Sequence, residues 1–163
     1  DWQNFEHIRA LAPDDFKSQA LGQLQAAGID TGARDAAYTD AALALCTDKI
    51  KNLNDIAGYI GFFFRDTVEA DAEAAAQALT PENKPHLAAL REAYADLAQF
   101  DADSLMESLK ATAATREVKN KVLVMPARVA CTGSKVGPSL YHLMELLGQA
   151  EVLKRFDAAL TAM

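Results

Sequence analysis

The sequence is poor in the residues from which metal centres are built. It contains two cysteines and three histidines among 163 residues. His7, His86 and His142 each lack a second ligand at the spacing that zinc sites use. No apolar run reaches the roughly 18 residues that a membrane-spanning helix requires, and the first residues do not form a secretory signal. We therefore expect a cytoplasmic protein with no metal site and no contact with a membrane.

Nucleotide-binding and nucleophilic motifs are also missing. The chain has neither the G-x-x-x-x-G-K-[ST] phosphate loop nor the G-x-G-x-x-G dinucleotide fingerprint. The sequence assigns no base and no orienting acid to Ser134, Ser139 or Cys131 as nucleophiles. Cys46 and Cys131 lie in apolar helical contexts, which is typical of buried free thiols. The sequence thus predicts no catalytic residue and no cofactor site.

Helical spacing of apolar residues runs along nearly the whole chain, half of which is apolar. The predicted fold class is all-α, a two-lobed helical bundle of about nine to ten helices. Thr80 and Pro81 form a cap followed by proline at the first helical position, so we place the lobes at residues 1–80 and 81–163. The predicted helices are 4–11, 13–28, 35–47, 52–65 and 66–78, then 81–98, 102–114, 116–132, 138–147 and 149–161.

The charge distribution is uneven. The net charge is −7, which by itself disfavours a polyanionic partner. Between Arg116 and Arg155, however, seven basic residues face three acidic ones, so this segment carries +4 and the remainder −11. A basic stripe on an acidic body suits a protein that docks a polyanion in one orientation, although any single lysine fits a solvated helix face equally well.

Residues 128–141 read RVACTGSKVGPSLY and are followed by an apolar helical pattern. Gly133 is placed to end a helix, because the residue after a helix often adopts a left-handed conformation that glycine tolerates. Pro138 can open the next helix, where its missing N–H is not needed. Arg128 and the backbone of the turn would then share one edge. By spacing alone, a simple helix-turn-helix packing unit explains the segment as well.

The segment resembles the closing motif of bacterial glutamyl-tRNA synthetases, in which an arginine on a helix precedes a Thr-Gly stop, a Gly-Pro restart and Leu-Leu-Gly. The first residues, DWQN and then HIR, resemble the linker that follows the catalytic core of that family. The resemblance implies the C-terminal anticodon-binding region of a class I aminoacyl-tRNA synthetase. The catalytic signatures of the family do not occur here. The resemblance therefore implies that the parent protein is a glutamate–tRNA ligase and that this chain alone is not catalytic.

The resemblance also implies which residues bind RNA. Arg128 matches the motif arginine, and the turn and helix start that cradle splayed anticodon bases match Gly137, Pro138, Leu140 and Tyr141. Lys135 adds positive charge beside the same turn. Lys49 falls where relatives that reject the glutamine tRNA carry an arginine, and a lysine lacks the bidentate fork of that residue.

The partner that follows is the tRNA for glutamate, with the glutamine tRNA as a second candidate, bound by a monomer. The resemblance places ATP and magnesium in the parent protein and no cofactor in this chain. The alternative is a helical protein-interaction module on the same scaffold that does not bind RNA, which the acidic first lobe favours.

Overall fold

The computed structural model describes residues 13–29, 36–46, 56–65, 68, 70–135 and 137–163. Every regular element in these ranges is a helix, so the predicted all-α class is confirmed. The chain divides into two compact units, residues 1–66 and 67–163. None of the helices that the structure describes has the length and the apolar stretch needed to cross a membrane.

The first unit contains the helices α2 (Pro13–Ala26), α3 (Ala36–Cys46) and α4 (Ile56–Ile60), followed by a 3-10 turn at Gly61–Phe64. α4 packs on both α2 and α3. The Tyr38 hydroxyl donates a hydrogen bond of 2.7 Å to the Phe63 carbonyl, and its ring meets Phe63 and Phe64 edge to face. All three consecutive phenylalanines are buried and pack in the core of this unit: Phe62, Phe63 and Phe64.

The second unit contains the helices α5 (Ala72–Ala78), α6 (Lys84–Ala95), α7 (Ala102–Thr115), α8 (Asn120–Thr132), α9 (Leu140–Leu147) and α10 (Gln149–Ala162). α8 packs against every other helix of this unit. Tyr94 is fully buried at its centre, where its hydroxyl donates to the Leu105 carbonyl at 3.0 Å and its ring stacks on Phe156. Because α8 packs against all of these helices, its C-terminal half, which carries Arg128, has a defined position within the unit.

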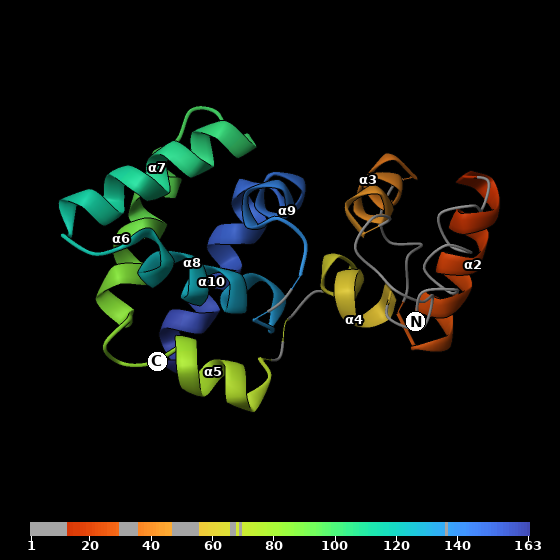
Figure 1. Cartoon of the computed structure of the whole chain (residues 1–163), viewed down its shortest axis with the longest axis horizontal. Helices are drawn as coiled ribbons and strands as arrows, with labels where there is room; N and C mark the ends of the chain where they lie inside the picture. The colour runs from red at the N-terminus through yellow and green to blue at the C-terminus, as the bar shows by residue number, and fades with distance from the viewer. Residues whose placement is uncertain (1–12, 30–35, 47–55, 66–67, 69, 136) are drawn as a thin grey trace. The chain divides into compact units, whose positions relative to one another are not determined.

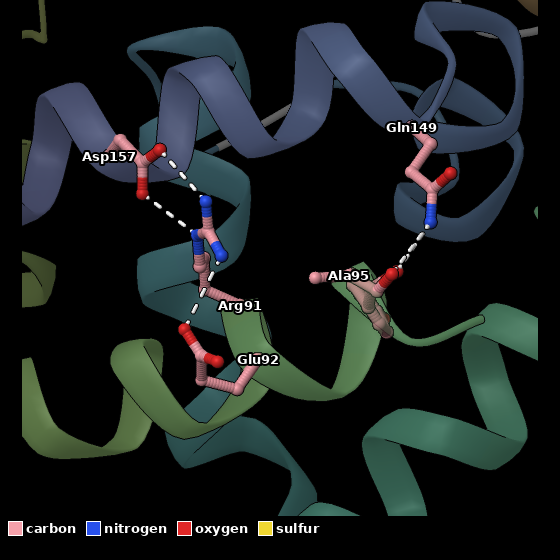
Figure 2. Close-up of polar contacts among 6 residues, drawn as sticks. Arg91, Glu92, Ala95, Gln149 and Asp157 are labelled. Atoms are coloured by element: carbon pink, nitrogen blue, oxygen red, sulfur yellow. Dashed lines mark hydrogen bonds and ion pairs between the residues drawn. The ribbon is translucent and has the colours of Figure 1, made fainter.

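Two contacts join α10 to α6 (Figure 2). Arg91 of α6 donates to both carboxylate oxygens of Asp157 at 2.9 and 3.2 Å. The Gln149 side chain, at the start of α10, donates to the Tyr94 carbonyl at 2.9 Å and lies 3.3 Å from the Ala95 carbonyl. Gln149 thereby adds a side-chain donor to carbonyls at the end of α6, where intrahelical partners run out.

The unit boundary lies earlier in the chain than residue 80, because α5 packs with the second unit. Ala74 and Ala78 are buried against Val129 of α8. The backbone N–H of Asp71, the cap of α5, donates to the Gly133 carbonyl at 2.7 Å. Alanine side chains are short, so they let α5 approach α8 closely while its polar face stays exposed.

Candidate functional site

The candidate site is the connection between α8 and α9, of which the structure describes residues 133–135 and 137–139. α8 ends at Thr132, and Gly133 follows with φ 79°, the left-handed conformation predicted for it. The Gly133 N–H donates to the Val129 carbonyl at 2.8 Å. The Thr132 hydroxyl lies 2.8 Å from the Arg128 carbonyl and 2.9 Å from the Ser134 carbonyl, and it accepts from the Ser134 N–H. The chain therefore leaves α8 through a turn that its own last residues hold in place.

Arg128, in the last turns of α8, contacts the far end of this connection. Its Nη1 donates to the Pro138 carbonyl at 2.7 Å, and its side chain is half-buried. Gly137 lies against the same nitrogen, since a Cβ atom on Gly137 would be 3.3 Å from Nη1. The structure thus brings together three of the predicted site residues, and Arg128 is only half-buried there.

α9 begins later than predicted. Its cap is Ser139 and its first residue is Leu140, so Pro138 precedes the helix and does not open it. Pro138 instead lies in the connection, where its carbonyl accepts the hydrogen bond from Arg128. The Ser139 side chain makes no capping hydrogen bond to the first turn of α9.

The predicted residues after the turn differ in exposure. Leu140 is 3% exposed because it lies on the apolar face of α9, which packs on α7, α8 and α10. Tyr141 is half-buried, and burial raises the pKa of its hydroxyl. Tyr141 is therefore partly open to solvent beside the turn, whereas Leu140 is a packing residue in this structure.

Lys135 is held by α5. Its Nζ donates to the Gln77 side-chain oxygen at 2.8 Å and lies 3.9 Å from the Glu73 carboxylate. Glu73 and Gln77 are four residues apart on the exposed face of α5 and hydrogen-bond to each other. Their spacing on one helix face is visible in the sequence, but the contact with Lys135 is not.

Arg155 is buried, although its charge was counted with the basic segment. It is 4% exposed. Its Nη1 donates to the Cys131 carbonyl at 2.7 Å, and its Nε donates to Glu151 at 2.9 Å. No motif in the sequence pointed to this arginine, because helical spacing does not tell which charged residue of α10 faces inward.

The other basic residues do not form a single stripe. Lys119 and Lys121 are exposed at the start of α8, whereas Lys135 follows its end. A helix of 13 residues separates them by about 20 Å. Arg116 donates from Nε to Nδ1 of His86 at 2.8 Å. The positive charge close to the connection comes from Arg128 and Lys135.

Cys131 is a buried free thiol, as predicted, and burial raises its pKa to about 12. The side chain of Cys46 and the whole of Lys49 lie outside the described residues. Among the residues that the structure describes, no group of three or more His, Cys, Asp or Glu side chains is placed to hold a metal ion.

Comparisons with known proteins give matches that cover nearly the whole chain. A family model described as an anticodon binding domain matches residues 11–160. The chain is 38% identical over 157 residues to the glutamate–tRNA ligase of Mycolicibacterium smegmatis, covering 96% of this chain and 32% of that protein. It is 36% identical over 160 residues to the glutamate–tRNA ligase of Oleidesulfovibrio alaskensis, covering 97% and 34%. The chain thus spans about a third of the length of the curated relatives it matches.

A solved structure with the same fold is the glutamate tRNA ligase of Elizabethkingia meningosepticum in complex with its amino acid. It superposes with a TM-score of 0.81 at 22% identity, over 98% of this chain and 31% of that one. The glutamate–tRNA synthetase of Elizabethkingia anophelis gives a TM-score of 0.76 at 21% identity. At these identities the similarity concerns the fold.

Proposed function

Because the chain belongs to the anticodon-binding domain family and is homologous to the C-terminal region of glutamate–tRNA ligases, we propose that it binds the anticodon arm of a tRNA. The observation that carries the proposal is the position of Arg128. Its guanidinium is anchored on the Pro138 carbonyl at 2.7 Å, and the residue as a whole is half-buried beside a tight turn. The tRNA for glutamate is the expected ligand.

The chemistry of the connection suits single-stranded bases. Proteins read such bases by stacking them on aromatic rings or on arginine guanidinium planes and by hydrogen bonds to their edges. Arg128 supplies a guanidinium plane, and the exposed part of Tyr141 supplies a ring. The backbone of Gly137 carries no side chain that would keep a base away from Arg128. Lys135, tethered to Gln77 at 2.8 Å, adds a positive charge that attracts phosphate.

A protein-interaction module without RNA binding is not favoured, because the family match covers nearly the whole chain. We propose that the glutamine tRNA binds more weakly than the glutamate tRNA, and that Lys49 contacts the last anticodon base. A lysine donates hydrogen bonds but does not form the bidentate fork of an arginine. We further propose that the protein acts in the cytoplasm as a monomer, and that ATP and magnesium serve the catalytic part of the parent ligase.

The experiment that tests the proposal is a titration of the chain with the anticodon stem-loop of the glutamate tRNA, followed by fluorescence anisotropy. Arg128→Ala should weaken binding by roughly 1–3 kcal/mol, the value typical of a lost base-stacking contact. The salt concentration must be the same throughout, because phosphate contacts make affinity strongly salt-dependent.

Arg91→Ala is the matched control. It removes an arginine of the same unit that forms an ion pair with Asp157 on the α6–α10 contact. We expect this variant to bind the stem-loop like the parent. Equal affinities for Arg128→Ala and the parent would contradict the proposed site, and so would a parent that binds an unrelated stem-loop equally well.

A further inference from the structure

A buried arginine of α10, Arg155, contacts the end of α8 and pairs with Glu151 of its own helix. Arg155 uses two nitrogens of its guanidinium: Nη1 binds the Cys131 carbonyl at 2.7 Å, and Nε binds the Glu151 carboxylate at 2.9 Å. Cys131 is three residues after Arg128 and one before Thr132, whose hydroxyl orders the turn. We propose that Arg155 is a positioning residue for RNA recognition, which holds the end of α8 so that Arg128 keeps its place against Pro138. This inference rests on the proposed function.

The position of the contact supports a role in geometry. The last four carbonyls of a helix have no partner within the helix, and the Cys131 carbonyl belongs to this group in α8. A cation there also interacts favourably with the helix dipole. Three elements meet at this point: Arg155 binds the Cys131 carbonyl, Asp71 binds the Gly133 carbonyl, and Arg128 binds the Pro138 carbonyl. Each of these hydrogen bonds restricts the movement of the connection between α8 and α9.

Stability alone does not explain a buried arginine at this position. Taking a guanidinium and a carboxylate out of water costs about as much as their attraction returns, and apolar residues of similar volume often stabilise a core equally well. What an apolar residue lacks is a directional donor aimed at one carbonyl. Glu151, with its side chain 22% exposed, fixes the plane of the Arg155 fork and thereby the direction of the Nη1 bond.

The test compares two arginines that each link α10 to another helix: Arg155, which belongs to α10, and Arg91 of α6, whose bond to Asp157 is drawn in Figure 2. Arg155→Met removes the bond to α8, and Arg91→Met removes the bond between α6 and Asp157 of α10. The first readout is the Nε–Hε signal of Arg128 in the ¹⁵N NMR spectrum of the folded protein without RNA, assigned by its loss in Arg128→Lys. Arg155→Met should shift or broaden this signal, whereas Arg91→Met should leave it unchanged.

The second readout is affinity for the glutamate anticodon stem-loop, measured at temperatures where each variant is folded. We expect Arg155→Met to weaken binding roughly fivefold to tenfold, within the range of coupling between residues that share a network. The same substitution in an Arg128→Ala background should have no further effect on affinity. A purely structural role would instead weaken binding equally in both backgrounds.

Arg155→Lys serves if Arg155→Met does not fold. Lysine keeps the charge but does not bind the carbonyl and the carboxylate through one planar group, so it should also shift the Arg128 signal and weaken binding. An unchanged Arg128 signal in a folded Arg155 variant would overturn the inference. If Arg128→Ala binds like the parent, the proposed function fails, while the NMR comparison still decides whether Arg155 positions Arg128.

Discussion

Adding one methyl group at Gly137 should disturb RNA binding through Arg128. A Cβ atom at this position would be 3.3 Å from the Arg128 Nη1, which is closer than an unstrained contact between a methyl carbon and a nitrogen. Arg128 cannot simply turn aside, because the same nitrogen donates to the Pro138 carbonyl at 2.7 Å. In Gly137→Ala the guanidinium must therefore move by a few tenths of an ångström, and this bond lengthens.

The size of the effect follows from that one bond. A hydrogen bond made by a charged group contributes about 1.5–3 kcal/mol net, and lengthening it removes a part of that. If a base stacks on the guanidinium, the displaced plane loses some of the stacking as well, which is worth roughly 1–3 kcal/mol when the side chain is removed altogether. We expect Gly137→Ala to weaken stem-loop binding by about 1 kcal/mol, close to fivefold.

Gly22→Ala is the matched glycine substitution. Gly22 lies within α2, and a Cβ atom there would meet nothing within 4 Å. Alanine in a helix interior is about 0.5–1 kcal/mol more stable than glycine, so this variant should unfold at higher urea concentration and bind RNA like the parent. Anisotropy titrations at one salt concentration give the affinities, and urea unfolding shows that each variant is folded.

The decisive comparison is between Gly137→Ala, Arg128→Ala and the double variant. If the methyl group acts through Arg128, the double variant should bind no worse than Arg128→Ala alone, because coupled residues do not show additive losses. Binding of Gly137→Ala that equals or exceeds that of the parent would refute the argument. Fully additive losses would show that Gly137 contacts the RNA independently of Arg128.

Three further predictions concern specificity, catalysis and pH. Lys49→Gln should narrow the preference for a glutamate over a glutamine anticodon, measured as a ratio of affinities for two stem-loops that differ only in the third anticodon base. An unchanged ratio would mean that Lys49 contacts the RNA backbone or is a solvated helix residue. The chain mixed with ATP, glutamate and tRNA should produce no charged tRNA above background, and charging in the absence of contaminating synthetase would contradict this. Burial raises the pKa of the Cys131 thiol to about 12 and also raises the pKa of Tyr94. The unfolded chain therefore loses these protons first, and the free energy of unfolding should fall as pH rises above about 9, by up to ~1.4 kcal/mol per pH unit and group. Urea unfolding between pH 8 and 11 checks this, and Tyr94→Phe should show a smaller decline.

Several boundaries of the fold could be predicted because they depend on neighbouring residues. The helix predicted at 102–114 is observed at Ala102–Thr115, and the one predicted at 149–161 is observed at Gln149–Ala162. Gly133 ends α8 in the left-handed conformation expected from its type. Proline, glycine and the spacing of apolar side chains act within one or two turns of a helix, so a single sequence contains their effect.

The candidate site was predicted in part for the same reason. Arg128, Gly137 and Pro138 lie within a stretch of eleven residues around one turn, and the turn itself brings them together. The sequence predicts the start of α9 two residues too early, since a proline that precedes a helix cap and one that opens a helix look alike in sequence. The roles of these residues toward RNA came from resemblance to a family, and they remain predictions.

Contacts between distant segments were decided by the tertiary structure alone. Arg155 and Cys131 are 24 residues apart, and Lys135 and Gln77 are 58 apart. Which charged side chain of a helix turns inward depends on the angle at which that helix packs, and many helices far apart in sequence determine this angle together. Composition and local pattern thus determined an all-helical chain with an arginine beside a tight turn. Packing decided that α5 joins the second unit, that Arg155 is buried, and that Arg155 binds a carbonyl at the end of α8.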